Sequence, residues 1–264
     1  MNDQSTFMKN NGAPSFFVRI GMPADTPTEP TPELLSEVHY RAALSVPYEN
    51  LDILDGKRIS LDRDALFDKI VTRARGGYCF EVNALLEHML REMGFSVRSC
   101  LARFLRGEST VPLRRHRIAI VTLNGEKYFC DIGIGQSAPR LPLLLKEGII
   151  QEQFAEKYRF LLDGELGWVL YDLHQGQWRK FISFTEEKQY EVDYVEPSFY
   201  CEAHPDSPFN KKAMVAIKTA DGRKTVDGRD FKIFKGTELV RIEENMSEER
   251  FLEVLSSEFG IILR

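Results

Sequence analysis

The feature that most constrains this sequence is an Asn-Gly dipeptide at 124–125. It separates two runs that are typical of strands, HRIAIVTL at 116–123 and EKYFCDIG at 126–133. Asn-Gly favours the positive φ angles that a two-residue hairpin loop needs at both of its central positions. The dipeptide therefore predicts an antiparallel hairpin in which Leu123 pairs with Glu126.

This register brings a histidine close to a carboxylate. Counting back from the turn places Ile118 opposite Asp131 and His116 opposite Gly133. His116 and Asp131 are then diagonal neighbours on one face, about 7–8 Å apart at Cα and within side-chain reach. A three-residue loop would instead put them on opposite faces. We therefore expect a carboxylate to orient an imidazole here, although a lone strand histidine is more often a surface or core residue.

The other histidines lack such a partner. The chain has five histidines, and His39 and His88 lie within expected helices without a comparable carboxylate. His174 and His204 lie in turn-like segments, where we expect them to be solvated. The candidate base is therefore His116.

The first third of the chain carries helical patterns. Thr31 is placed as the N-cap of one helix, with Pro32 at the first helical position. A second helix is expected over 62–75, ended by the glycines at 76–77. A third helix is expected over 79–93, because its apolar residues recur at helical spacing.

Strand patterns follow, and the end of the chain is mixed. A last amphipathic helix is expected from Ser247 to Gly260. Helices followed by strands and a mixed tail indicate an α+β protein. The expected strands lie at 95–105, 116–123, 126–133, 167–173, 178–184, 213–219 and 231–236.

One cysteine stands where a helix is expected to begin. The segment RGGYCFEVN (75–83) places Cys79 directly behind two glycines, which allow a sharp turn and leave the sulfur approachable. The helix macrodipole favours a thiolate there, and the N–H groups, notably that of Cys79, can stabilise an oxyanion. With His116 as base and Asp131 as its orienter, this set predicts acyl transfer through a thioester. A single cysteine is nevertheless more often a small buried hydrophobe.

Composition narrows the expected partners. A net charge of -5 without a basic patch argues against nucleic acid, and no run of about 18 apolar residues predicts a membrane-spanning helix. The first residues lack the apolar core of a signal peptide, so we expect a cytoplasmic protein with reduced thiols. No C-x-x-C pair occurs, and no metal is expected.

Beyond these patterns, the sequence resembles the arylamine N-acetyltransferase family. The order Cys79, His116, Asp131 agrees with that family, and the likeness covers about residues 16–220. His116 heads a strand, as in the family. The segments that carry the likeness are VPYENLDIL (46–54), matching P-[FY]-E-N-L; RGGYCFEVN (75–83), matching the nucleophile motif; DIGIG (131–135), corresponding to D-V-G-F-G; and, more weakly, HPDSPF (204–209).

The resemblance implies a fold and an activity. The implied fold has an N-terminal helical bundle (1–94), a central β-barrel (95–205) and a C-terminal α/β lid (206–264), with a papain- or transglutaminase-like core. The implied reaction is ping-pong: Cys79 takes an acetyl group from acetyl-CoA and passes it to an arylamine or arylhydrazine. Such enzymes serve xenobiotic metabolism, without a metal and without nucleic-acid or membrane partners, as monomers or homodimers.

The resemblance also implies binding residues and shows two departures. The implied substrate and cofactor contacts are Tyr48, Ile134, Gly135 and Phe209, and Arg75 is expected to form a buried ion pair with Glu49. Ile134 stands where the family often has phenylalanine, and Arg115 stands where a small residue commonly precedes the histidine. Both changes bear on acceptor preference.

Two alternatives to the acetyltransferase remain open. The same Cys-His-Asp set would serve an amide synthase, or a thioesterase or amidase with water as the acceptor. A non-enzymatic relative that binds CoA or an aromatic ligand is the third reading, against which the intact set of three residues argues.

Overall fold

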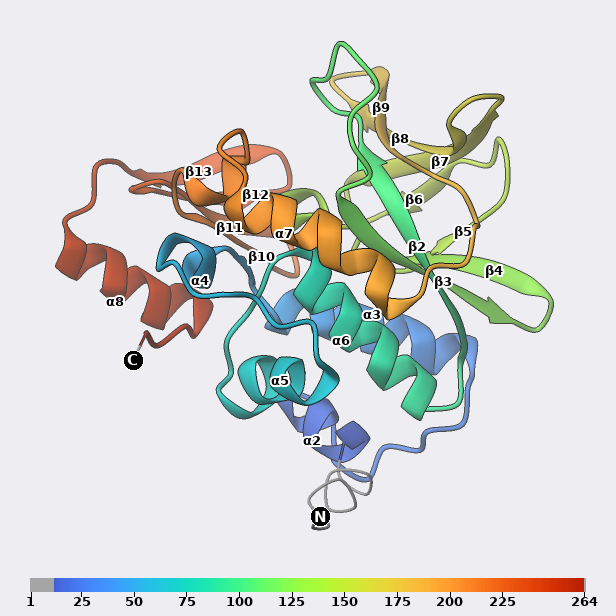
Figure 1. The fold of residues 1–264 in the computed structure, drawn as a ribbon, viewed down its shortest axis with the longest axis horizontal. Helices are drawn as coiled ribbons and strands as arrows, with labels where there is room; N and C mark the ends of the chain where they lie inside the picture. The colour runs from blue at the N-terminus through green and yellow to red at the C-terminus, as the bar shows by residue number, and fades with distance from the viewer. Residues whose placement is uncertain (1–11, 264) are drawn as a thin grey trace.

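The computed structural model describes residues 12–263 and shows two β-sheets with helices packed against them (Figure 1). Among these residues, no helix has the length and apolar character needed to cross a membrane. The helices are α2 (Gly12–Arg19), α3 (Pro32–Ser45), α4 (Leu51–Leu54), α5 (Arg63–Phe67), a π-helical turn η1 (Asp68–Thr72), α6 (Cys79–Glu92), α7 (Val195–Ala203) and α8 (Glu248–Phe259), with 3-10 turns η2 (Gly135–Ser137), η3 (Glu191–Tyr194) and η4 (Pro208–Asn210).

The larger sheet has eight strands and is nearly closed into a barrel. Its spatial order is β5-β4-β3-β2-β9-β8-β7-β6, and all of its ladders are antiparallel. Its strands are β2 (Ser96–Phe104), β3 (His116–Leu123), β4 (Glu126–Cys130), β5 (Leu143–Leu144), β6 (Gln151–Gln153), β7 (Glu156–Asp163), β8 (Gly167–His174) and β9 (Gln177–Phe184).

Two glutamine side chains join the edges of this sheet. The amide of Gln151 donates to the carbonyl of Leu144 at 2.9 Å and accepts from its N–H at 2.7 Å. Gln153 makes the same pair of bonds with Leu141, at 2.8 and 2.9 Å. Each amide therefore takes the place of a strand residue, and the seam between β5 and β6 keeps its backbone groups satisfied.

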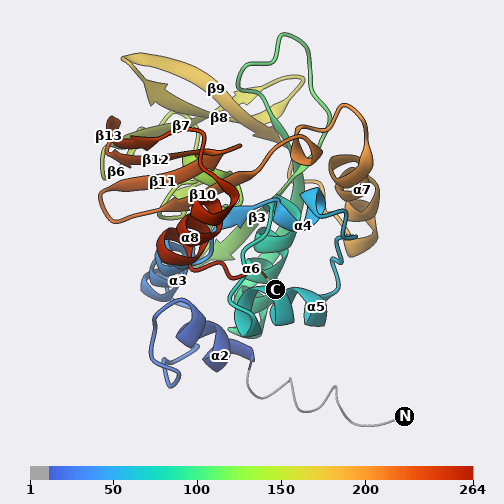
Figure 2. The ribbon, with the colours of Figure 1, turned by 90° about the vertical axis from the view of Figure 1, so that its left-hand side faces the viewer.

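The smaller sheet has five strands in the order β1-β10-β11-β12-β13. Helix α8 lies against this sheet, as Figure 2 shows from the side. Its buried side chains there are Phe251, Val254, Leu255 and Phe259. The strand β1 comes from the N-terminal part of the chain, so this sheet ties the two ends of the molecule together. Its strands are β1 (Tyr48–Glu49), β10 (Met214–Lys218), β11 (Gly222–Asp227), β12 (Asp230–Lys235) and β13 (Glu238–Glu243).

Helix α6 lies between the other helices and the large sheet. It contacts β3 and β2 on one side and α2 and α5 on the other. A single apolar cluster joins these elements, and all of its side chains are buried. Its members include Phe16, Phe17, Leu35, Val38, Val82, Leu86, Met89, Ala119 and Val121.

Most of the strongly patterned predictions are confirmed. Thr31 accepts a hydrogen bond from Leu34 N–H and caps α3, whose first residue is Pro32. Gly94 adopts a φ of 88° directly after α6, as a helix stop requires. The predicted hairpin forms with Leu123 opposite Glu126.

Two local predictions are wrong. The helix expected over 62–75 ends at Thr72, because Ala74 turns the chain with a φ of 53°. The ladder of the hairpin stops at the pair Ala119 and Cys130, so the predicted pairs of Ile118 with Asp131 and His116 with Gly133 do not form.

Several elements were not predicted at all. They are short or mostly polar, so neither spacing nor β-branched content distinguishes them. They are α2, α4, β5, β6, β7, β11, β13 and α7. The polar segment at residues 1–11 lies outside the described residues, so the expectation about a signal peptide stays a prediction.

The glutamine seam predicts the effect of a single substitution. Gln153→Leu leaves the N–H and carbonyl of Leu141 unpaired in a site where Gln153 is only 5% exposed. We expect the free energy of unfolding to fall by about 1–3 kcal/mol in urea titrations. The matched control is Glu152→Leu on the same strand, whose exposed side chain predicts a change within about 0.5 kcal/mol. Equal free energies of unfolding for the two variants would show that the hydrogen bonds of Gln153 do not stabilise the seam between β5 and β6.

Candidate active site

Helix α6 begins at Cys79, as the sequence predicted. The side chain of Glu81 accepts a hydrogen bond from the N–H of Tyr78 at 3.2 Å, which secures the residue before the helix. The N–H groups of Glu81 and Val82 donate to the carbonyl of Tyr78, so those of Cys79 and Phe80, which have no intrahelical acceptor, stay available near the sulfur.

The two glycines before α6 are needed because a side chain at either position would clash with neighbouring atoms, and not because the backbone turns unusually there. Neither has a positive φ, which corrects the predicted role in a sharp turn. A Cβ on Gly76 would lie 1.9 Å from the carbonyl oxygen of Pro47, and one on Gly77 would lie 2.8 Å from Glu81. The glycines let the strand segment at Tyr48 pass directly against the nucleophile loop, where Tyr48 and Gly77 form a parallel bridge.

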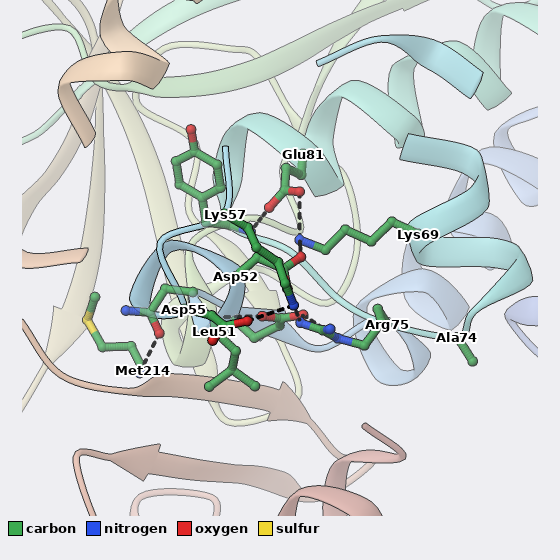
Figure 3. Close-up of polar contacts among 12 residues, drawn as sticks. Leu51, Asp52, Asp55, Lys57, Lys69, Ala74, Arg75, Glu81 and Met214 are labelled. Atoms are coloured by element: carbon green, nitrogen blue, oxygen red, sulfur yellow. Dashed lines mark hydrogen bonds and ion pairs between the residues drawn. The ribbon is translucent and has the colours of Figure 1, made fainter. Parts of the chain in front are cut away.

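A buried network of ion pairs holds the nucleophile loop, the segment at 75–78 that precedes α6 (Figure 3). The ammonium of Lys69 lies 2.7 Å from Glu81 and 2.8 Å from Asp52. The guanidinium of Arg75 lies 2.7 Å from Glu49 and 3.2 Å from Asp52, which confirms the predicted ion pair and extends it. Breaking such a buried set by removing one member leaves an uncompensated charge.

Three carboxylates share two cations in this network, and both Glu49 and Glu81 are buried. Burial raises the pKa of Glu81 to about 7, while the charge and hydrogen bond of Lys69 lower it. The carboxylate that secures the start of α6 therefore depends on Lys69 to stay ionised.

His116 and Asp131 meet as the hairpin predicted. His116 Nε2 lies 2.6 Å from Asp131 Oδ2, and both side chains are buried. The second carboxylate oxygen, Oδ1, accepts from Asn83 Nδ2 and from Gly133 N–H, both at 2.8 Å. Every oxygen of this buried carboxylate is therefore hydrogen-bonded.

Two side chains replace the ladder where it stops. Asn83 donates to the carbonyl of Arg117 at 2.6 Å and accepts from the N–H of Ile132 at 3.0 Å. His39 accepts from the N–H of Asp131 at 3.1 Å. Because these bonds occupy the groups that would have paired across the strands, the chain after Cys130 leaves the sheet without losing hydrogen bonds.

The sulfur of Cys79 contacts the backbone of the two residues that flank His116. Its thiol donates to the carbonyl of Arg115 at 3.8 Å, and the N–H of Arg117 is also directed to it. Gly133 packs against the same residue, since a Cβ there would lie 2.9 Å from Cys79 Cα. The nucleophile helix, the histidine strand and the aspartate loop therefore converge on one point.

Burial dominates the acidity of this thiol. It raises the pKa of Cys79 well above its ordinary value, with smaller contributions from Cys201 and Asp131. The N–H groups of Arg117 and Phe80 act in the opposite direction. The helix terminus was expected to favour a thiolate here, and burial outweighs that effect. A thiol in such a place needs a base that accepts its proton inside the site.

A cavity of about 650 Å³ opens on these groups. Cys79 and His116 line it, whereas Asp131 lies fully buried behind them. Its volume is in the range of small-molecule sites, and it also reaches the smaller sheet. The four residues proposed for substrate contact, Tyr48, Ile134, Gly135 and Phe209, all line it, together with Phe104, Arg106, Arg115, Lys212, Val215, Thr225, Lys232 and Phe234.

Three contributors to the site were missed by sequence reasoning. Asn83 lies in the motif RGGYCFEVN, one turn after Cys79, and that spacing could have placed it on the same face of the helix. His39 was not a candidate because it lies within an expected helix, where short-range geometry places no carboxylate beside it as the hairpin does for His116. The residues of β11 were missed because that strand was not predicted, and the strand expected at 231–236 carried no signal that placed it at the site. No group of His, Cys, Asp or Glu side chains among residues 12–263 is arranged to hold a metal.

Comparisons with known sequences agree on one family. A family model described as N-acetyltransferase matches residues 31–264. The arylamine N-acetyltransferase of Mycobacterium tuberculosis is 35% identical over 242 residues, covering 89% of this chain and 84% of the relative. The Escherichia coli arylamine N-acetyltransferase is 32% identical over 231 residues, covering 87% and 82%.

Solved structures give the same result. The arylamine N-acetyltransferase of Salmonella typhimurium superimposes with a TM-score of 0.91 at 30% identity, covering 96% of this chain and 92% of that one. The Mycobacterium marinum enzyme in complex with CoA gives 0.87 at 30% identity, covering 94% and 92%. The chain therefore belongs to the arylamine N-acetyltransferase family of acyltransferases.

Proposed function

We propose that this protein transfers the acetyl group of acetyl-CoA to an arylamine or arylhydrazine by a ping-pong mechanism through a Cys79 thioester. The observation that carries the proposal is the hydrogen-bonded pair of His116 and Asp131, whose histidine lines the same cavity as Cys79. The family membership and the CoA complex of the Mycobacterium marinum relative support the donor.

The first half-reaction moves the acetyl group to sulfur. Since Asp131 occupies Nε2 of His116, Nδ1 is the ring nitrogen left to take the thiol proton. The sulfur of Cys79 attacks the thioester carbonyl, and N–H groups of the first turn of α6 stabilise the oxyanion. The C–S bond to CoA then breaks, and His116 returns the proton to the departing thiolate.

The second half-reaction uses the same groups in reverse. The amine nitrogen attacks the carbonyl carbon of acetyl-Cys79, and His116 accepts the proton that the nitrogen loses. The C–S bond to Cys79 breaks, the amide leaves, and the thiol is restored. Asp131 stabilises the imidazolium in both steps and fixes its orientation.

The cavity wall suits both substrates. Aromatic and aliphatic side chains, Tyr48, Ile134 and Phe209 among them, offer contact area to an aromatic acceptor, and Gly135 leaves room beside Tyr48. The cationic side chains that line it offer partners to the phosphates of CoA. They are Arg106, Arg115, Lys212 and Lys232.

The C-terminal segment is proposed to act as the lid of this site. Thr225 and Phe234, from β11 and β12, line the same cavity as Cys79. We accordingly retain the division into a helical bundle (1–94), a barrel (95–205) and an α/β lid (206–264), with a papain-like core, as part of the proposal. A cytoplasmic location and a monomer or homodimer without metal, nucleic-acid or membrane partners remain predictions from the sequence.

Mass spectrometry tests the thioester directly. Incubation with acetyl-CoA should add one acetyl group to the peptide that contains Cys79, and an arylamine should remove it as the acetylated amine. Cys79→Ala should lower transfer by at least ~10³-fold, because no other group takes the acetyl. Cys100→Ala, a buried thiol of the barrel, is the matched control and should keep transfer. Steady release of CoA without any amine, as fast as with one, would instead identify a thioesterase.

The role of His116 predicts a change in pH dependence. In His116→Ala the thiol loses its proton acceptor, and burial, which raises the pKa of Cys79, then sets its reactivity alone. Because a raised thiol pKa lowers the thiolate fraction at neutral pH, alkylation of Cys79 by iodoacetamide at pH 7 should fall by ~10-fold or more. Its midpoint should lie above the value of about 8.5 of a free thiol.

The control for this experiment is His204→Ala. His204 is partly exposed and lies outside the cavity lining, so this variant should keep the alkylation profile of the native protein. A His116→Ala profile that coincides with the native one would exclude His116 as the base.

A further inference from the structure

A second histidine touches the aspartate from the side opposite His116. The ring of His39, on α3, is 1% exposed and spans two backbone groups. Its Nε2 accepts the N–H of Asp131 at 3.1 Å, and its Nδ1 lies 3.0 Å from the carbonyl oxygen of Arg140. Asp131 is therefore held by one imidazole at its carboxylate and by another at its backbone.

The two contacts of His39 define one tautomer. Because Nε2 accepts a proton from Asp131 N–H, it carries a lone pair, so Nδ1 carries the hydrogen and donates to Arg140. Burial lowers the pKa of His39 to about 4, although the carbonyl of Arg140 and the charge of Asp131 raise it. The ring is neutral at physiological pH and adds no positive charge that would compete with the His116 imidazolium for Asp131.

Arg140, whose carbonyl accepts the hydrogen bond from His39, is itself held by other residues. The guanidinium of Arg140 is 2.9 Å from the carbonyl oxygen of Thr219, in the turn between β10 and β11, and 2.8 Å from Glu156 on β7. His39 therefore joins the aspartate loop to a residue fixed to both sheets. The bond matters at this place because the ladder between β3 and β4 has already ended at Cys130.

From this geometry we infer that His39 is a positioning residue for the acetyl transfer, which acts by fixing the backbone of Asp131 so that its carboxylate faces His116. It touches neither substrate nor sulfur, and it does not line the cavity. The inference rests on the proposed function, since it assigns the support of the group that orients the base.

Three substitutions of His39 separate its two bonds. Leucine removes both of them. Asparagine keeps a donor near Nδ1, toward Arg140, but brings no acceptor to Asp131. Glutamine offers an amide whose N–H and oxygen can serve both partners at once. Val38→Ala, the neighbouring buried position on α3, is the control for a loss of stability without a loss of these hydrogen bonds.

The measurements are kcat, the KM for acetyl-CoA, and the pH dependence of Cys79 alkylation. For His39→Leu and His39→Asn, kcat should fall about 10- to 100-fold while KM stays within about twofold. The alkylation midpoint should rise by ~1 pH unit, because a less well oriented His116 accepts the thiol proton less readily. His39→Gln should stay within about threefold of the native kcat, and Val38→Ala should keep the native midpoint.

Two outcomes would overturn the inference. An alkylation midpoint in His39→Asn equal to that of Val38→Ala would reduce His39 to a structural role. A His39→Gln variant as impaired as His39→Asn would show that the pair of hydrogen bonds is not what matters. Failure of the proposed function looks different, since the native protein itself would then show no acetylation of Cys79. If His39→Leu does not fold, the two amide variants still decide the question.

Discussion

The buried carboxylate of Asp131 is the constraint on which the rest of this structure depends. A charge removed from water costs several kcal/mol unless partners satisfy it. Here the partners come from three places: His116 on β3, Asn83 on α6 and Gly133 in the loop itself. His116 and Gly133 belong to the same hairpin segment as Asp131, whereas Asn83 reaches the carboxylate only when α6 has packed on the sheet, so the complete set of partners forms together with the native packing.

A second set of buried charges lies on the other side of the nucleophile loop. There the cations Lys69 and Arg75 hold three carboxylates around the segment that precedes α6 (Figure 3). The start of α6 therefore contacts two sets of buried polar groups, those around Asp131 and those around Glu49. The apolar cluster of α2, α3 and α6 fixes the rest of the helix. This arrangement suits a nucleophile that must stay in one place through two half-reactions.

The sequence predicted the structure best where a short motif allows only one backbone conformation. Asn124-Gly125 set the hairpin register, and that register alone predicted that His116 and Asp131 meet. The partners that complete the site were not predictable in this way. His39 lies 92 residues from Asp131, and whether they touch depends on how α3 packs against the sheet. The role of the glycines at 76–77 was predicted wrongly for a similar reason. Gly76 leaves space for the carbonyl of Pro47, which belongs to another segment of the chain.

Cys79 and Asn83 are one helical turn apart, and this spacing links chemistry to architecture. Residues four apart lie on one face of a helix, so α6 carries both the nucleophile and the side chain that binds Asp131 and the carbonyl of Arg117. A shift of α6 along the sheet would therefore strain those hydrogen bonds as it moved the sulfur. A cysteine on a free loop would have no such coupling. Asn83 therefore fixes the position of Cys79 relative to β3 and Asp131, although Asn83 itself forms no bond to the substrate.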